Sequence, residues 1–332
     1  MMEICKLIAS FFVVCIHVPF PGELGRIVSC LARFAVPMFF AISGFFSYRA
    51  SCGKLQKRIW HIVKLNIVAV TIQIAWNLCA TLLYGGTMAD WVQTLHIGWI
   101  DIVKWLVLNV NPFGWHLWYL ASIFVCYVAV WGYACYYGDE KTDYFLLYIL
   151  CVCLTAVHFL LGEFSWIFGI EVSYEIPRNA VFFGLPMFTL GMFLRQYGEC
   201  ILEKIHLTTG KSVLLLLTSA TISVLESRYM GNAELYLSTI VTVVILMLLS
   251  MRHRQLCTGI VGDVINRFGA YSTVIYIVHM VVHEYYMGMQ QYGIYLRLGE
   301  LEMVLRPLII ITVSLLIAVG VDCCVSIIHL RK

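Results

Sequence analysis

The chain has 332 residues, of which 61% are hydrophobic and 12% are charged, and its mean hydropathy is +0.86. Soluble domains carry roughly 25% charged residues, so this composition excludes an ordinary soluble protein and predicts an all-α polytopic membrane protein. The formal net charge of +3 is small and no Lys/Arg-rich block accompanies it, so we expect no nucleic-acid partner.

Apolar runs along the chain predict about ten transmembrane helices, because one span needs about 20 mostly apolar residues. The expected spans, in chain order, are 4–20, 27–48, 59–84, 115–137, 144–161, 180–197, 211–226, 234–250, 268–288 and 304–328. The first run has no cleavage motif after it, so we expect it to be retained as a helix. Together the spans predict a single transmembrane domain over residues 1–332.

Residues 88–109, between the third and fourth spans, alternate apolar and polar side chains at helical spacing. This pattern is typical of a helix that lies on the membrane surface rather than crossing the membrane. We therefore predict a surface helix there.

The distribution of Lys and Arg orients the spans. With both termini inside the cell, fifteen of the 22 basic residues fall on the cytoplasmic side, as the positive-inside rule requires. The loop 138–143 runs against this bias, with three acidic residues and one lysine inside. We predict a plasma-membrane protein with N-terminus and C-terminus in the cytoplasm.

The 13 cysteines lie mostly within apolar runs and show no CxxC pair with metal-site spacing. Free cysteine behaves as a small buried hydrophobic residue. We therefore expect buried thiols rather than a disulfide framework.

Two ionisable residues lie within apolar runs near the start of the chain. His17 ends "KLIASFFVVCIH" about 13 residues along the first span, which is roughly 20 Å from its inner end. A neutral imidazole can act as a general base there, or it can bond water or a carbonyl at the interface. Arg33 lies a quarter of the way into the second span and can face a protein interior or extend to the outer interface.

The loop 48–64 is the most basic stretch of the chain. Arg58 and His61 are spaced i, i+3 on the third span, so they share a helix face that can bind a phosphate-bearing cofactor. Membrane anchoring explains Lys54 and Lys57 equally well.

On the outer side, the fourth span begins with His116, Trp118 and Tyr119 in "WHLWYL". These residues fit an aromatic belt at the membrane interface, or a binding site. Arg178 precedes the sixth span, and Glu226 ends the seventh close to Arg228, with which it can form an ion pair.

His279 and His283 are one turn apart in the ninth span. Two histidines at this spacing can bind zinc, but no third ligand follows in a recognised pattern. We therefore expect no metal site.

Several of these stretches occur together and in a fixed order along nearly the whole chain. They are "KLIASFFVVCIH", "RFAVPMFFAISGFF", "KRIWH", "WHLWYL", "RNAVFFGLPMFTLGMFLR" and "FGAYSTVIYIVHMVV". In this order they resemble the acyltransferase-3 family of bacterial integral membrane proteins, which transfer acyl groups to cell-surface sugars and related acceptors. Two of the stretches look particularly like the membrane portion of the vancomycin-resistance serine racemases.

The resemblance implies that His17 is the family's essential first-helix histidine. It also implies that the family's R-x-x-R motif falls at Arg58 and His61, where this chain reads R-x-x-H. We expect Lys57 or Lys64 to supply the missing positive charge.

The function expected from the resemblance is transmembrane acyl transfer, most simply O-acetyl transfer, from cytoplasmic acetyl-CoA or another acyl-CoA to a hydroxyl of an extracytoplasmic cell-surface acceptor. The acceptor class is a glycan, a peptidoglycan precursor or an amino acid. His17 is expected to deprotonate the acceptor hydroxyl and Arg33 to stabilise the oxyanion. The residues expected to contact the acceptor are His116, Trp118, Tyr119, Arg178, Glu226 and His279.

Two other functions fit the residues. A transporter of serine or another small amino acid would use spans interrupted near Pro37 and Pro186, although no inverted repeat is evident. A membrane scaffold without chemistry is the third possibility. The sequence leaves the oligomeric state open, a homo-oligomer included.

Overall fold

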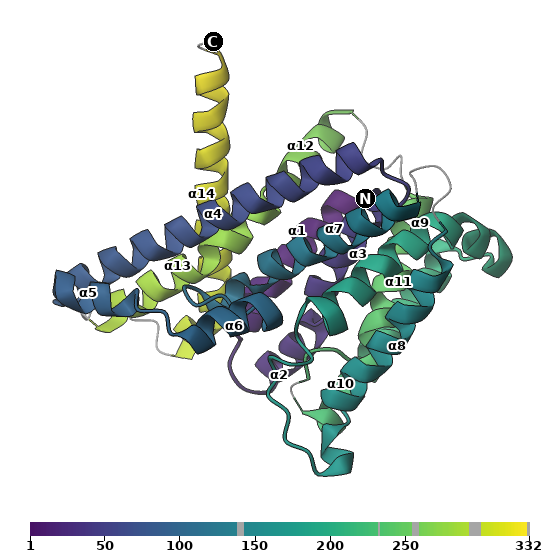
Figure 1. The fold of residues 1–332 in the computed structure, drawn as a ribbon, viewed down its shortest axis with the longest axis horizontal. Helices are drawn as coiled ribbons and strands as arrows, with labels where there is room; N and C mark the ends of the chain where they lie inside the picture. Colours follow the sequence, from purple (N-terminus) through teal and green to yellow (C-terminus); the bar gives the residue numbers. More distant parts are fainter. Residues whose placement is uncertain (138–142, 232, 254–258, 292–299, 331–332) are drawn as a thin grey trace. The chain divides into compact units, whose positions relative to one another are not determined.

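The computed structural model describes residues 1–137, 143–231, 233–253, 259–291 and 300–330. Over these residues the chain is helical and contains no strand (Figure 1). The prediction of an all-α protein is therefore confirmed. The chain divides into two compact units, a terminal unit (residues 1–35 and 253–332) and a central unit (residues 36–252).

In the terminal unit, the first helix packs against all four others. The helices are α1 (Met2–His17), α2 (Gly22–Ala32), α12 (Gly259–Ala270), α13 (Ser272–Gln291) and α14 (Glu300–Leu330). Apolar side chains of α1, α13 and α14 form its core, with Val14, Ile275 and Ile310 almost fully buried. Burial of these side chains fixes the face of α1 that points inward.

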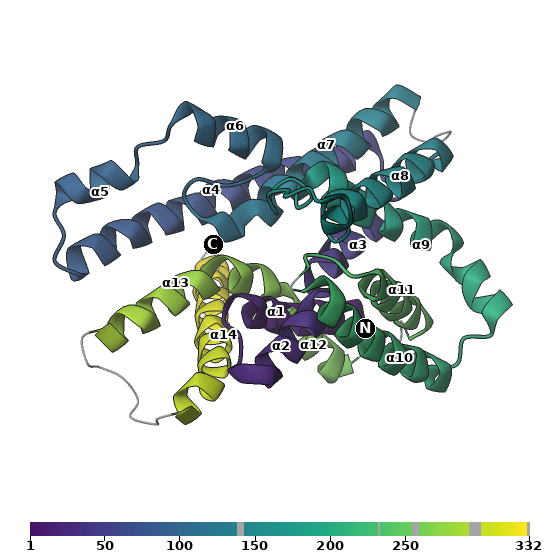
Figure 2. The same ribbon diagram turned by 90° about the horizontal axis from the view of Figure 1, so that it is seen from below.

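The central unit contains the remaining helices. They are α3 (Ala35–Ser47), α4 (Cys52–Leu83), α5 (Met88–Thr94), α6 (Trp99–Leu108), η1 (Trp115–Leu117), α7 (Trp118–Tyr137), α8 (Phe145–Leu161), η2 (Ser165–Phe168), η3 (Ala180–Gly184), α9 (Leu185–Ile205), α10 (Thr209–Met230) and α11 (Leu237–Arg252). The main packed pairs are α4 with α7, α8 with α9, α9 with α11 and α10 with α11 (Figure 2).

Two glycines bring the backbones of α3 and α9 into contact. A Cβ atom added to Gly44 on α3 would lie 1.7 Å from the carbonyl oxygen of Phe188 on α9. A Cβ atom added to Gly191 on α9 would lie 1.8 Å from the carbonyl oxygen of Ala41 on α3. Small residues of this kind let membrane helices approach closely and pack by van der Waals contact. The two glycines therefore form a reciprocal backbone contact.

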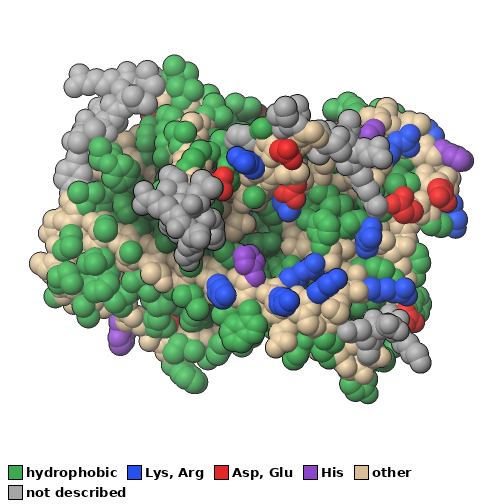
Figure 3. Space-filling model, turned by 90° about the horizontal axis from the view of Figure 1, so that it is seen from above, with side chains coloured by type: hydrophobic (Ala, Val, Ile, Leu, Met, Phe, Trp, Pro, Cys, Tyr) green, Lys and Arg blue, Asp and Glu red, His purple; other side chains and the backbone are tan. Residues whose placement is uncertain are grey.

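Five of the segments that the structure describes are long and apolar enough to cross a membrane. They are Gly22–Ser47, Cys52–Leu83, Trp115–Tyr137, Thr209–Met230 and Leu301–Ser326. The apolar helices α8 and α11 have 17 and 16 residues, so each is about 25 Å long, shorter than the roughly 30 Å hydrocarbon core of a bilayer. Ten spans therefore stay a prediction. Hydrophobic side chains cover much of the face drawn in Figure 3, with Lys and Arg side chains grouped among them.

The second expected span, residues 27–48, falls almost entirely within the candidate span Gly22–Ser47. Within it, two residues, Arg33 and Phe34, separate α2 from α3. The Arg33 N–H donates to the Cys30 carbonyl oxygen at 3.2 Å, which tightens the last turn of α2. Pro37 then lies in the first turn of α3, where its missing N–H costs no helical hydrogen bond.

The stretch 88–109 forms two short helices, α5 and α6, instead of the one predicted helix. Each has its own start: Thr87 and Asp90 form a capping box on α5, and Asp101 accepts from the Gly98 N–H on α6. The bond from the Thr87 N–H holds the pKa of the exposed Asp90 below its ordinary value. No residue of either helix is buried, and Trp99 is 76% exposed. Placement of both helices on a membrane surface stays a prediction.

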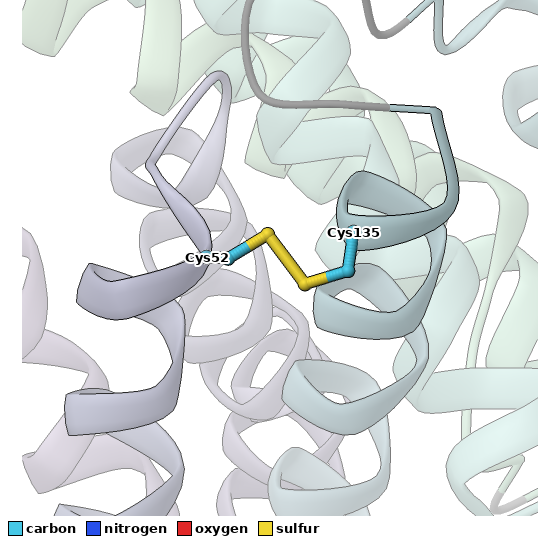
Figure 4. The surroundings of a disulfide bond; sticks show 2 residues. All are labelled: Cys52 and Cys135. Carbon is cyan, nitrogen blue, oxygen red and sulfur yellow. A yellow bond between two sulfur atoms is a disulfide. The ribbon is translucent and has the colours of Figure 1, made fainter.

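Cys52 and Cys135 form a disulfide that joins the start of α4 to the end of α7 (Figure 4). The expectation of thiols throughout is therefore wrong for this pair. Sequence spacing could not reveal it, because the two cysteines are 83 positions apart and α5, α6 and η1 lie between the helices that carry them. Among the other described cysteines, Cys15, Cys126 and Cys151 are buried thiols as expected. The expectation of burial is wrong for five exposed thiols, Cys79, Cys153, Cys200, Cys323 and Cys324.

The disulfide gives a test of the predicted orientation. Disulfides persist in oxidising compartments, whereas the excess of basic residues places this end of α4 in the cytoplasm. The predicted orientation places this disulfide on the reducing side of the membrane. If that orientation is correct, Cys52 and Cys135 are alkylated in living cells by a membrane-permeant maleimide without prior reduction. Peptide mass spectrometry checks this result.

Cys79 is the matched control, because it is exposed near the other end of α4. In the same cells it is expected to react with a membrane-impermeant maleimide. If Cys52 and Cys135 react only after reduction, and Cys79 is protected from the impermeant reagent, the predicted orientation is inverted.

Candidate functional sites

The terminal unit brings His17 and His279 together. His17 is the last residue of α1, half-buried, and its ring stacks on that of His279 of α13 with centroids 5.1 Å apart and planes 28° apart. This contact is made through the faces of the two rings rather than through their ring nitrogens. The two histidines, 262 positions apart in the sequence, therefore form one candidate site.

The protonation of His279 follows from its hydrogen bonds. Its side chain is fully buried, and Nδ1 lies 2.8 Å from the Tyr276 carbonyl oxygen and 3.1 Å from that of Ile275. Carbonyl oxygens only accept hydrogen bonds, so Nδ1 carries the hydrogen and donates it. These bonds to its own helix fix the plane of the ring against which His17 packs.

Arg33 lies in the same unit, at the junction of α2 and α3. Its side chain is 8% exposed, so it is enclosed by protein rather than extended to the surface. The neighbouring Phe34 packs edge-on against Phe12 of α1, with ring centroids 5.3 Å apart. This contact attaches the junction to α1, the helix that carries His17.

In the central unit, the structure brings Trp118 and Arg178 together. The Arg178 guanidinium lies over the Trp118 ring at 5.3 Å and over the Tyr174 ring at 4.5 Å. Its Nη1 atom is 3.6 Å from Oε1 of Glu234. Both Arg178 and Trp118 are buried, so an interfacial aromatic belt does not describe Trp118. A guanidinium stacked on aromatic faces is instead typical of a built binding site.

His116 and Tyr119 belong to the same stretch but face different surroundings. His116 is 2% exposed, at the 3-10 turn that starts α7. Tyr119 packs edge-on against Phe40 of α3, with centroids 4.8 Å apart. These positions are compatible with a lining role, which stays a prediction for both.

Glu226 has a clear structural role. Its Oε2 atom accepts from the Ser238 N–H at 3.2 Å and from the Ser238 hydroxyl, at the start of α11. A carboxylate at a helix N-terminus is stabilising because it satisfies free N–H groups and faces the positive end of the helix dipole. Contact of Glu226 with an acceptor stays a prediction.

The basic start of α4 is split between two environments. Arg58 is half-buried, and its Nη1 donates to the Ser47 hydroxyl of α3 at 2.8 Å. His61 is exposed on the same helix. Lys57 and Lys64 are also exposed, so three of the four predicted donor-binding residues are accessible to a ligand and Arg58 is held in place.

A further arginine, which was not among the predicted site residues, lies near this end of α3. The guanidinium of Arg195, on α9, lies over the Phe45 ring at 5.2 Å. Phe45 precedes Ser47 by two residues, so Arg58 and Arg195 both contact the last turns of α3. The signal in the sequence was an arginine ending the apolar run of the sixth span.

The sequence analysis also missed a fully buried pair in the central unit, His158 and Glu163. Their side chains are 0% and 2% exposed. The signal was present, because "VHFLLGEF" places a histidine inside an apolar run, as "VVCIHVPF" does for His17. Their surroundings could not be read from the sequence, because their partners come from distant segments.

The fold and these buried polar clusters define an all-helical membrane protein. A family model described as an acyltransferase domain matches residues 2–323, and the chain therefore belongs to the acyltransferase-3 family. The family resemblance of its motifs is confirmed by this match, which covers nearly the whole chain. No curated protein and no solved structure matches the chain. The likeness to the membrane portion of serine racemases stays a prediction.

Proposed function

We propose that this acyltransferase moves an acetyl group from cytoplasmic acetyl-CoA to a hydroxyl group of an extracytoplasmic acceptor. Family membership supports acyl transfer. The observation that carries the proposed mechanism is the stack of His17 on the oriented ring of His279. It holds the ring of the histidine at the end of α1 against a second, oriented imidazole.

In the proposed reaction, the neutral ring of His17 takes the proton of the acceptor hydroxyl. The acceptor oxygen attacks the acetyl carbonyl carbon, and the carbon–sulfur bond to CoA then breaks. The CoA thiolate leaves and takes up the proton, so the products are the acetyl ester and free CoA. The buried positive charge of Arg33 would stabilise the oxyanion of the tetrahedral intermediate.

For the donor, the chain offers positive charge at the start of α4. Arg58 presents a half-buried guanidinium, and His61, Lys57 and Lys64 are exposed beside it. A guanidinium binds phosphate oxygens in a bidentate manner. We assign the phosphates of acetyl-CoA to this group.

For the acceptor, we assign the Arg178 cluster, with Trp118, His116 and Tyr119 from the start of α7. Aromatic faces beside a guanidinium and a carboxylate suit a polyhydroxylated acceptor such as a glycan or peptidoglycan precursor. Glu226 supports this end of the central unit through α11. The proposal includes ten spans with both termini in the cytoplasm of a plasma-membrane protein.

Replacing Arg58 by alanine is expected to weaken acetyl-CoA binding by about 10-fold to 100-fold, since a charge-assisted hydrogen bond contributes about 1.5–3 kcal/mol. Calorimetry on protein in lipid nanodiscs measures the change. Arg228→Ala is the control, because Arg228 lies in the last turn of α10 and is not one of the assigned donor-binding residues.

Equal affinity of the Arg58→Ala variant and the native protein would contradict the donor-site assignment. No acetyl-CoA binding by the native, folded protein would contradict the proposed donor. Uptake of labelled serine by proteoliposomes, in the absence of acetyl transfer, would support the transporter function instead.

A further inference from the structure

His158 lies near the end of α8, and its hydrogen bonds fix one of its protons. Its Nδ1 atom is 2.9 Å from the carbonyl oxygen of Pro177. Because a carbonyl oxygen only accepts, Nδ1 carries a hydrogen and donates it. The ring's second nitrogen, Nε2, therefore holds a lone pair when the ring is neutral and a second N–H when it is charged.

The Nε2 atom of His158 faces a carboxylate, 3.5 Å from Oε1 of Glu163. The same Glu163 oxygen accepts from the Leu235 N–H at 3.2 Å. The rings of Phe159 and Phe183 pack against the imidazole, with centroids 5.6 Å and 5.5 Å away, so apolar groups surround the pair. The imidazole and the carboxyl group of this pair therefore face each other at ion-pair distance in a buried, apolar site.

His158 and Glu163 bind backbone groups of two residues that are sequence neighbours of the Arg178–Glu234 ion pair. Pro177, which accepts from His158, immediately precedes Arg178 in the chain. Leu235, which donates to Glu163, immediately follows Glu234. Arg178 and Glu234 form the ion pair described above, with Arg178 stacked on Trp118. His158 and Glu163 thus hold the backbone on both sides of that ion pair.

We propose that His158 and Glu163 form a positioning dyad that sets the geometry of the Arg178–Glu234 pair in the acceptor site. The inference rests on the proposed function for the identity of that site. The dyad does not touch the acceptor, because both side chains are buried. It acts through the Pro177 carbonyl and the Leu235 N–H. The contact between the two side chains links these two backbone contacts, so replacement of Glu163 is expected to affect both segments.

Glu163→Gln is the sharpest variant because it is isosteric. In one orientation the amide oxygen of the glutamine accepts from the Leu235 N–H. In the other, the NH2 group donates to a neutral His158 ring. Neither orientation lets one oxygen face both groups as Oε1 of Glu163 does. His158→Asn is the complementary variant, since its amide N–H can still reach the Pro177 carbonyl while nothing faces Glu163. Glu171→Gln is the control, on an exposed residue of the same loop.

The first measurement is hydrogen exchange of residues 174–182 and 233–238 in lipid nanodiscs, which needs no activity. Glu163→Gln is expected to increase exchange in both segments. His158→Asn is expected to increase it in 233–238 and to preserve protection in 174–182. Native exchange in both segments of the Glu163→Gln variant would overturn the dyad.

The second measurement is acetyl transfer from acetyl-CoA, radiolabelled in the acetyl group, to a washed bacterial cell-envelope fraction. Glu163→Gln is expected to raise the half-saturating envelope concentration by about tenfold, with acetyl-CoA affinity unchanged within about twofold. The double variant Glu163→Gln/His158→Asn is expected to raise the half-saturating envelope concentration no further than the more strongly affected single variant does. An unchanged half-saturating concentration, or an equal loss of acetyl-CoA affinity, would overturn the positioning role.

Failure of the proposed function gives a different result. If the native protein transfers no label, the assignment of acetyl transfer fails, while the exchange measurement still decides whether the dyad holds the Arg178 and Glu234 segments.

Discussion

Replacing His17 by glutamine is expected to lower the rate of acetyl transfer by about 10²-fold to 10⁴-fold, the usual contribution of a general base. Glutamine preserves a polar side chain of similar size at the end of α1, but it cannot take a proton from a hydroxyl group. The rate is measured as transfer of radiolabelled acetyl from acetyl-CoA to a cell-envelope fraction.

Two controls separate loss of chemistry from loss of structure. His96→Gln changes an exposed histidine between α5 and α6 and is expected to leave the rate unchanged. Calorimetry is expected to give the His17→Gln variant native affinity for acetyl-CoA, because the assigned donor residues lie on α4. A His17→Gln variant with the native transfer rate would exclude His17 as the base.

Replacing Gly191 by alanine is expected to destabilise the central unit by about 1–3 kcal/mol or more, the range found when atoms are forced into a packed interior. The new Cβ atom would lie 1.8 Å from the Ala41 carbonyl oxygen, which belongs to the backbone and cannot rotate away. Gly44→Ala is expected to have the same effect from the opposite helix, through Phe188. The fraction of monodisperse protein in detergent after heating measures the loss.

Gly132→Ala is the matched control, since this glycine lies inside α7 and an added Cβ would meet no atom within 4 Å. Alanine there is expected to stabilise the helix by about 1 kcal/mol, because glycine is the poorer helix former. Native thermal stability of both Gly44→Ala and Gly191→Ala would show that α3 and α9 are not in backbone contact.

Hydrophobic periodicity predicted the helices well because it depends on local sequence. The long apolar runs that became α7 and α14 were located within about four residues of their observed ends, whereas α4 begins at Cys52, ahead of its expected start at 59. Breaks were harder to predict. Arg33 and Phe34 interrupt a run that reads as continuous, and nothing local distinguishes their turn from a helical conformation. The Cys52–Cys135 disulfide was not predicted, because nothing local in the sequence marks the two cysteines as partners.

Some of the candidate site residues could be selected from the sequence, and others could not. His17 and Arg58 could be selected from the sequence, because an ionisable residue in or beside an apolar run is costly unless it has a function. The partners could not be selected. The contacts of His17 with His279, of Trp118 with Arg178 and of His158 with Glu163 depend on how the helices pack.

The sequence by itself determined that this chain is a helical membrane protein of the acyltransferase-3 family, with ionisable residues at defined positions in its apolar helices. Composition and periodicity report where the chain is buried in an apolar environment, and motif order reports the family. Only the tertiary structure decided which buried polar groups are partners in hydrogen bonds and ion pairs. Hydrogen bonds and ion pairs act over a few ångströms, so they arise only when folding brings distant segments together, as it does for Pro177, His158, Glu163 and Leu235.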